Sequence, residues 1–543
     1  MMLQRRRWRP VQTFALWSLL ALAVAHPSLA DDPQPKPTRT TGARLDFIDE
    51  KLRESWAEFS IKPSRVASDE EFLRRAYLDL LGRIPNISEA NGFLRSKEAG
   101  KRAKLVEYLL VHPDYPKNFA TIWKVILLGR KDQAREVDPQ ALTNWLRRQF
   151  NENRPWNEMA FDLIDAKGSN KENGAVNFSL AHMGDGAINL TSITTRVFLG
   201  QQIQCTQCHD HPSNDWKQAD FWGINAFYKG LRSEPVQTTN AAGTVTLDHY
   251  ELFDEPTDQY SSYERRDAQL RIAFPTFLDG RKISQNKDVD RREALARFIT
   301  EPSNEALAKA YVNRMWGHFL GRGFVQPVDD FGAHNLPSQP ELLDELARNF
   351  QSSGYDTKML IRWIMNSEAY NLTSATTKDN DKDETLFSHM NLKPMTPEQL
   401  FDSLIVATAA HKTAGADQAD RRDRWMRQFQ FAFAKDEGEE SSSFQGTIPQ
   451  ALMMMNGELM EKAVGGRSGS FLADLLDQAR LQKKGSFESY VVDTLYLAAL
   501  SRRPTGRERE AARHFLVNYP DTIGVMEDMF WSLLNSNEFV LNR

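Results

Sequence analysis

The two cysteines of this chain, Cys205 and Cys208, lie only three residues apart. A chain of 543 residues with no other cysteine cannot join distant segments through disulfides. Its stability must therefore come from a conventional hydrophobic core, and the chain is long enough to bury a large one. The composition agrees, because 41% of the residues are hydrophobic and 26% are charged. These values exclude a multi-pass membrane protein, a collagen-like chain and a mostly disordered chain.

The net charge is slightly negative, at −5 with histidine counted as neutral. Proteins dedicated to nucleic-acid binding usually carry a basic face that neutralises phosphates. We therefore expect that this protein does not bind nucleic acid.

The first 30 residues have the pattern of a secretory signal peptide. A basic stretch, RRRWR, precedes the uncharged and mostly apolar run TFALWSLLALAVA, and the small residues of SLA follow. The alternative is an N-terminal anchor that is not cleaved. The polar, proline-rich residues 31–43 are predicted to be a flexible leader. We expect an exported protein of the periplasm, cell envelope or extracellular space, with no transmembrane span in the mature chain.

Helix signals dominate the rest of the chain. Ser68 and Glu71 have the spacing of a capping box, and Gly82 stands where a helix would end. The same capping pattern recurs at Thr505 with Glu508 and at Ser338 with Glu341. Thr396 precedes a proline, as an N-cap residue commonly does. Further helices are predicted over 45–59, 101–111, 115–128, 138–150 and 156–165.

Strand signals are sparse and fall in one part of the chain. Residues 244–253 have β-favouring side chains in partial alternation, within a segment rich in proline, glycine and polar residues. We predict a mainly α fold with two helical domains, 44–230 and 286–543. The irregular segment 231–285 would connect them and could include a small β-hairpin.

The sequence Cys205-Thr206-Gln207-Cys208-His209 has the spacing of c-type haem attachment. Two thiols one turn apart can reach two vinyl groups on one side of a porphyrin, and the following histidine can ligate the iron. A metal site is the second interpretation, with zinc or iron bound by His209 and His211 together with the two cysteines. The third is a local disulfide in a non-catalytic surface module.

Other candidate residues are less specific. A haem iron often takes a second axial ligand, and His182 and Met183, in a glycine-rich stretch upstream, are candidates. In the second half, His318, Asp329, Asp330 and His334 could form a metal or acid–base group. The alternative is a structural corner in which Arg314 and Arg322 pair with the aspartates and Gly321 and Gly323 make the turn. We favour the structural corner.

Several long stretches resemble a known two-domain family. Residues 70–90, 101–130 and 196–228 are similar to the planctomycete cytochrome-related domain, and the last of these, RVFLGQQIQCTQCHDHPSNDWKQADFWGINAFY, contains the cysteine motif. Residues 304–350, which include NRMWGHFLGRGFVQPVDDFGAHN, resemble its companion planctomycete-specific domain. Residues 447–460 and 533–543 resemble later motifs of that companion domain.

The resemblance implies an exported two-domain protein of a family whose function is unknown, with a cytochrome association inferred from Cys205, Cys208 and His209. We therefore expect a haem c-like role in redox chemistry or electron transfer, with a redox or envelope protein as partner. A metal-binding envelope protein, as a hydrolase or as a partner in extracellular polymer breakdown, is the alternative. The sequence leaves open whether the protein is an enzyme.

Overall fold

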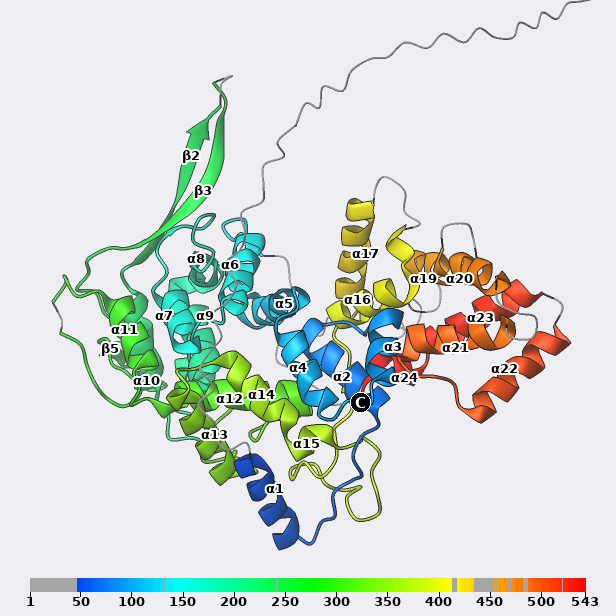
Figure 1. The fold of residues 1–543 in the computed structure, drawn as a ribbon. Helices are drawn as coiled ribbons and strands as arrows, with labels where there is room; N and C mark the ends of the chain where they lie inside the picture. The colour runs from blue at the N-terminus through cyan, green and yellow to red at the C-terminus, as the bar shows by residue number, and fades with distance from the viewer. Residues whose placement is uncertain are drawn as a thin grey trace, which may run out of the picture. The chain divides into compact units, whose positions relative to one another are not determined.

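The computed structural model describes residues 46–543 except 131–132, 241–242, 285, 413–417, 434–453, 455–456, 467–469, 482–486 and 520. The predicted signal peptide, 1–30, and leader, 31–43, lie outside the described residues. Most of the remaining chain is helical, and Figure 1 follows it from α1 to the C-terminus. The prediction of a mainly α fold is confirmed.

The first half of the chain forms a series of short helices. Their bounds are α1 Asp46–Glu58, α2 Asp69–Leu81, α3 Ile87–Arg95, α4 Lys101–Leu110, α5 Asp114–Leu128, α6 Pro139–Asn151, α7 Trp156–Asp165, α8 Val176–His182, α9 Gly184–Thr194 and α10 Gln218–Asn225. Three short segments among them are helical but not α-helical. They are the π-helix η1 Thr195–Leu199 and the 3₁₀ helices η2 Gln204–Gln207 and η3 Ala226–Tyr228.

The second half is also helical. Its helices are α11 Arg291–Thr300, α12 Glu305–Leu320, α13 Pro340–Ser352, α14 Thr357–Asn366, α15 Glu368–Asn371, α16 Pro397–Thr408, α17 Gln418–Phe433, α19 Glu458–Val464, α20 Phe471–Arg480, α21 Phe487–Leu500, α22 Gly506–Asn518, α23 Thr522–Leu534 and α24 Asn537–Val540. Two short strands, β6 Lys393–Pro394 and β7 Leu541–Asn542, pair antiparallel and bring the chain end back to the start of α16.

The predicted helix signals act largely as expected. The Ser68 side chain accepts from the Glu71 amide, the Glu71 carboxylate accepts from the Ser68 amide, and Gly82 ends α2 in the left-handed conformation. Thr396 and Thr505 cap α16 and α22 in the same way.

The predicted capping box of Ser338 and Glu341 is wrong. Helix α13 begins at Pro340 after Gln339, and no side chain caps it. The Ser338 amide instead donates to the Phe324 carbonyl, so Ser338 belongs to the preceding loop. Proline at the first helical position, where its missing N–H costs nothing, then sets the start of the helix.

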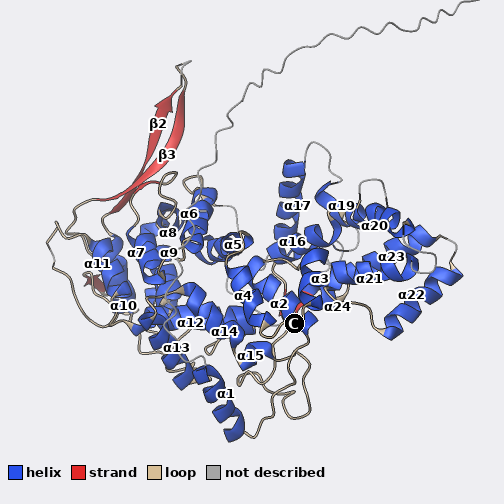
Figure 2. Ribbon diagram, in the orientation of Figure 1, coloured by secondary structure: helices blue, strands red, loops and turns tan. Residues whose placement is uncertain are grey.

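The segment between residues 231 and 285 contains strands β2 to β5, and the predicted small hairpin is among them. Strands β2 Leu231–Thr239 and β3 Val245–Asp254 form an antiparallel hairpin with an irregularity after Val236, and β1 Gly168–Ser169 pairs with the other edge of β3. A second small hairpin joins β4 Ser261–Glu264 to β5 Leu270–Ala273. Figure 2 shows β2 and β3 in red among elements that are mostly helices.

Two hydrophobic cores hold the described residues together. The larger core combines side chains from α1 to α10 with those of α11 to α15. At its centre the Trp156 ring lies 4.3 Å from Trp123 and 4.5 Å from Tyr311 of α12, and Tyr311 stacks on Phe350 of α13 at 5.1 Å. Both halves of the chain therefore contribute to one core.

The smaller core lies among α16 to α24 and takes in Leu78 and Ile84 from the first half. The described residues between 46 and 543 form one compact unit. The predicted domain boundaries stay a prediction. Among the described residues, no helix has both the length and the apolar character needed to cross a membrane.

Candidate functional site

The cysteine motif forms one exposed 3₁₀ turn, η2, with its neighbours. The buried Thr206 hydroxyl donates to the Ile203 carbonyl at 2.6 Å. From α10, the Trp222 indole and the Gln218 amide both donate to the Gln207 carbonyl, at 3.1 and 3.2 Å. The two residues between the cysteines therefore fix the turn to the protein.

Cys205 and Cys208 themselves are exposed and are not joined to each other. The Cys208 amide approaches the Cys205 carbonyl at 3.4 Å, so the two thiols lie on the same turn. Both are accessible to a reacting group that approaches from solvent.

His209 is half-buried, and its orientation is set by its own chain. Its Nδ1 lies 2.7 Å from the Asp210 carbonyl oxygen. A carbonyl oxygen can only accept, so Nδ1 must carry the ring proton. In the neutral ring the lone pair is then at Nε2. This is the tautomer in which Nε2 can ligate a metal ion or the iron of a haem.

His211 has the opposite arrangement. The backbone amides of Ser213 and Asn214 donate to its Nδ1 at 3.2 and 2.9 Å, so the neutral ring carries its proton at Nε2. Burial, followed by the nearby His334 ring, lowers the pKa of His211 and favours this neutral form. Ligation through Nε2 would need that proton to move to Nδ1, where it would oppose two amide N–H groups.

A loop from the second half of the chain, residues 329–335, contacts the segments that flank the cysteine motif. The Phe331 amide donates to the Gly200 carbonyl at 2.9 Å. Gly200 has a φ of 66°, and a side-chain carbon there would lie 2.7 Å from the Phe331 ring. At Gly332, an added carbon would lie 2.3 Å from Asn214 Oδ1. The left-handed backbone and the close Phe331 ring require glycine at position 200, whereas a side-chain carbon at position 332 would force the Asn214 side chain to move.

Polar contacts connect the same two segments. His334 Nε2 lies 3.2 Å from Asp330 Oδ2, and His334 Nδ1 lies 3.0 Å from Asn214 Oδ1. The His334 and His211 rings are 5.9 Å apart. Asp330 and His334, two residues of the predicted metal or acid–base group, thus lie near His211, just after the cysteine motif. The sequence patterns alone gave no reason to connect that group with the motif.

Known family models match both segments of the chain that contribute to this site. Residues 47–233 match the PSCyt2 model, described as a protein of unknown function (DUF1549). Residues 291–423 match the PSD1 model, described as a protein of unknown function (DUF1553). The chain combines a PSCyt2 domain with a PSD1 domain. The resemblance found in the motifs is confirmed, whereas no curated protein and no solved structure matches the chain.

The PSD1 residue Asp329 has a structural role, as favoured from the sequence. Its carboxylate accepts from Arg196 Nε at 3.1 Å and Gln202 at 2.8 Å, both in the PSCyt2 domain, and Arg314 lies 3.6 Å away. Gly321 ends α12 in the left-handed conformation, as expected. Arg322 differs from expectation, because its ion pair is with Glu384, at 3.7 Å.

The predicted axial-ligand candidates pack elsewhere in the PSCyt2 domain. His182 Nε2 lies 2.7 Å from the Leu127 carbonyl, and Met183 packs against the larger core. The Gly186 carbonyl, in the loop that follows, accepts from Asn225 of α10 at 2.9 Å. A role of His182 or Met183 as an axial ligand stays a prediction.

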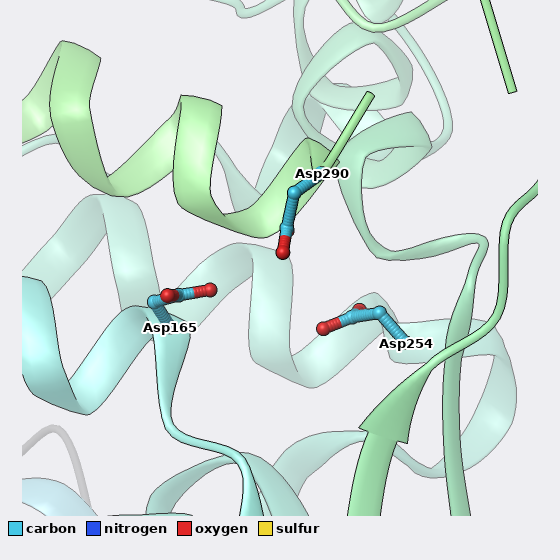
Figure 3. A group of neighbouring side chains, drawn as sticks. All are labelled: Asp165, Asp254 and Asp290. Atoms are coloured by element: carbon cyan, nitrogen blue, oxygen red, sulfur yellow. The ribbon is translucent and has the colours of Figure 1, made fainter. Parts of the chain in front are cut away.

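Sequence reasoning missed a cluster of three aspartates, Asp165, Asp254 and Asp290. Their carboxylates point toward one another in Figure 3, with one oxygen of each within 4.8 Å of the others. In the part of the chain that the structure describes, no other group of His, Cys, Asp or Glu side chains meets this criterion.

Cations already neutralise much of this cluster. Lys167 Nζ lies 3.1 Å from Asp165 and 3.8 Å from Asp254, and it also pairs with Asp290. The buried Arg292 donates to both oxygens of Asp254. The lysine thus stands where a cation would bind, and the cluster is best understood as a structural ion-pair network. It unites residues far apart in the sequence, so no local motif could have revealed it.

Proposed function

We propose that the chain is an exported redox protein that carries a covalently attached haem c on its PSCyt2 domain. Cys205 and Cys208 would form the two thioether bonds, and His209 would be the axial ligand. Bound haem would supply reversible one-electron transfer between ferric and ferrous iron, with a redox or envelope protein as partner. The main support is the Nδ1 contact of His209, which in the neutral ring leaves Nε2 unprotonated, together with the exposure of the two thiols on the same turn of chain.

The residues around the turn suit an apolar, planar group. Trp222, which donates to the carbonyl between the two cysteines, stacks on Tyr263 with the rings 2° from parallel and 5.9 Å apart. Both rings are half-buried, so part of each aromatic surface is open to solvent. A porphyrin attached to this turn would find aromatic surface beside it.

Thioether formation is also compatible with the thiols described. Each S–H adds across a vinyl double bond, with the sulfur bonding to one carbon and the hydrogen to the other. The step therefore needs no oxidant or leaving group.

The arrangement of His211 favours haem over a metal ion bound by the four side chains Cys205, Cys208, His209 and His211. His211 Nδ1 accepts from two backbone amides, so its Nε2 carries the proton and is not a ready donor to a metal. Of the two histidines, haem attachment needs only His209, as the ligand of the iron.

Expression in a host with haem-maturation machinery tests the proposal. We expect a Soret band that persists after denaturation and acid–acetone extraction, because the haem is covalently bound. The double variant C205S/C208S should lose this band. His209→Ala should keep the covalent haem but shift its spectrum, whereas the matched control His211→Ala should leave the spectrum unchanged.

Two outcomes would overturn the haem assignment. Stoichiometric zinc or iron without a Soret band would establish the metal-binding alternative. The absence of both, together with no titratable thiol, would establish a local disulfide between Cys205 and Cys208.

A further inference from the structure

The second hairpin, β4–β5, has one face that packs on the protein. The buried Ser261 hydroxyl donates to Asn225 Oδ1 of α10 at 2.8 Å, and the Tyr263 ring stacks on Trp222 of the same helix. Figure 1 shows β5 next to α10. Side chains alternate between the two faces of a strand, so those next to Ser261 and Tyr263 point away from α10. The hairpin therefore also has an outer face.

The outer face carries large apolar side chains that are open to solvent. Leu270 is 71% exposed and Ile272 is 51% exposed. Just beyond the strands, the Tyr260 and Phe274 rings lie 5.9 Å apart, and these side chains are 48% and 38% exposed. We call these four residues the hairpin patch. Single exposed apolar residues are common on proteins, whereas a contiguous patch marks an interaction surface.

The segment that contains the hairpin patch is basic, although the chain is acidic. Residues 260–287 include six arginines and lysines and three acidic residues, a net charge of +3, whereas the whole chain has −5. In the hairpin turn, Arg265 and Arg266 are exposed between Glu264 and Asp267. An apolar patch with a local excess of cations is complementary to an anionic membrane surface, which is apolar below its head groups.

The small size of the hairpin favours a membrane over a protein partner. Each strand has four residues and spans only about 13 Å, and the two strands lie about 5 Å apart. A stable protein interface buries about 800 Å² on each partner, which is several times the area of such a face. Membrane binding has no such minimum, because its strength grows with the buried apolar area and with attraction to anionic lipids.

We propose that the β4–β5 hairpin docks this protein on the surface of an anionic membrane. The hairpin patch would enter the boundary between head groups and acyl chains, and Arg265 and Arg266 would contact lipid phosphates. Helix α10 also contacts the cysteine turn through Trp222, so docking would bring that turn close to the membrane. The proposal is independent of haem attachment.

Co-sedimentation with lipid vesicles tests the proposal. Residues 31–543 are used, because the apolar run of the predicted signal peptide would bind lipid by itself and the described residues form one compact unit. We expect binding to vesicles of equal parts phosphatidylglycerol and phosphatidylcholine to be at least 10-fold stronger than binding to phosphatidylcholine alone. Raising the salt from about 0.1 M to about 1 M should remove most of this difference, because charges are then screened.

A substitution on the outer face tests the apolar contribution. The double variant Leu270→Ser/Ile272→Ser should weaken binding to the mixed vesicles at least 10-fold, because less apolar area enters the membrane. The matched control Val245→Ser/Val517→Ser changes two valines that are 57% and 73% exposed in other elements, and it should leave binding unchanged.

Charge variants test the electrostatic contribution. Arg265→Gln/Arg266→Gln should weaken binding to the mixed vesicles at least 10-fold, because each arginine near an anionic surface contributes a factor of about five. Glu264→Gln should strengthen binding, since Glu264 lies opposite Leu270 and repels anionic lipid. Arg348→Gln, at an exposed position of α13, is the control and should have no effect.

Hydrogen exchange locates the docking surface in the unsubstituted protein, so the test does not depend on the folding of a variant. The mixed vesicles should slow exchange across residues 260–274 and leave α22, residues 506–518, unchanged.

Several results would overturn the proposal. They are the absence of binding to the mixed vesicles, equal binding to both kinds of vesicle, unchanged binding of the folded Leu270→Ser/Ile272→Ser variant, and unchanged exchange at 260–274. Slower exchange at 260–274 at high protein concentration without vesicles would assign the outer face to a second copy of the chain instead.

Discussion

At the scale of single residues, the most consequential group is the buried Asp79 carboxylate. It joins α2 to Tyr370, to Lys393 and to Asn542 near the chain end, and it is almost inaccessible to solvent. Removing one partner of a buried ion pair leaves the other charge without compensation, which costs more than the pair itself contributes.

Asp79→Asn should therefore destabilise the protein by about 3–5 kcal/mol, because the Lys393 ammonium stays buried without a counter-charge. Urea denaturation followed by circular dichroism measures the loss. The control Asp477→Asn removes an exposed carboxylate that pairs with Arg480, and should change stability by less than about 1 kcal/mol. Equal stability of Asp79→Asn and the wild type would contradict this role.

At the scale of elements, α22 shows how a local signal and a tertiary contact combine. Glu508 completes the capping box with Thr505, as the spacing predicts. Its carboxylate also accepts two hydrogen bonds from Arg502, which in turn pairs with Glu538 of α24. The capping signal predicts the helix start, whereas the contact with α24 depends on the fold.

The paired Arg502 guanidinium lowers the pKa of Glu508 from its usual 4.5 to about 2. A carboxyl with a lowered folded-state pKa stabilises the protein above pH 4.5, and this contribution disappears as the pH falls from 4.5 toward 2. Glu508→Gln should therefore reduce the loss of melting temperature over that interval. The exposed Glu488→Gln of α21 serves as control, and an identical pH profile for wild type and Glu508→Gln would refute the expectation.

At the scale of the whole molecule, the PSD1 domain completes the environment of the PSCyt2 motif. Residues 329–335 contact both sides of the cysteine turn, at Gly200 and at Asn214. The aromatic stack of Trp123, Trp156 and Tyr311 likewise joins the two halves in one core. The positions of the segments that flank the motif therefore depend on the docking of the second domain.

Gly332→Ala should loosen this docking. The added carbon would overlap the Asn214 side chain, which is held in place by His334. We expect faster hydrogen exchange across residues 209–214 with little change in overall stability, measured by mass spectrometry. Gly92→Ala is the control, because an added carbon there meets no atom within 4 Å. Unchanged exchange at 209–214 would show that the contact does not restrain the motif.

Much of this protein could be predicted from local sequence patterns. Capping boxes at Ser68 and Thr505, and the β-favouring run before Asp254, act over a few residues and retain their effect in the fold. The Ser338 prediction failed because Pro340 and the Phe324 carbonyl competed with it. The haem assignment of Cys205 and Cys208 stays a prediction.

The sequence by itself determined the mainly α fold, the order of the two families and the cysteine motif, because each depends on residues close together in the chain. Only the tertiary structure decided the docking of His334 beside His211 and the burial of the Asp79 carboxylate against Lys393 and Asn542. These features depend on hydrogen bonds and packing whose geometry exists only once the chain has folded.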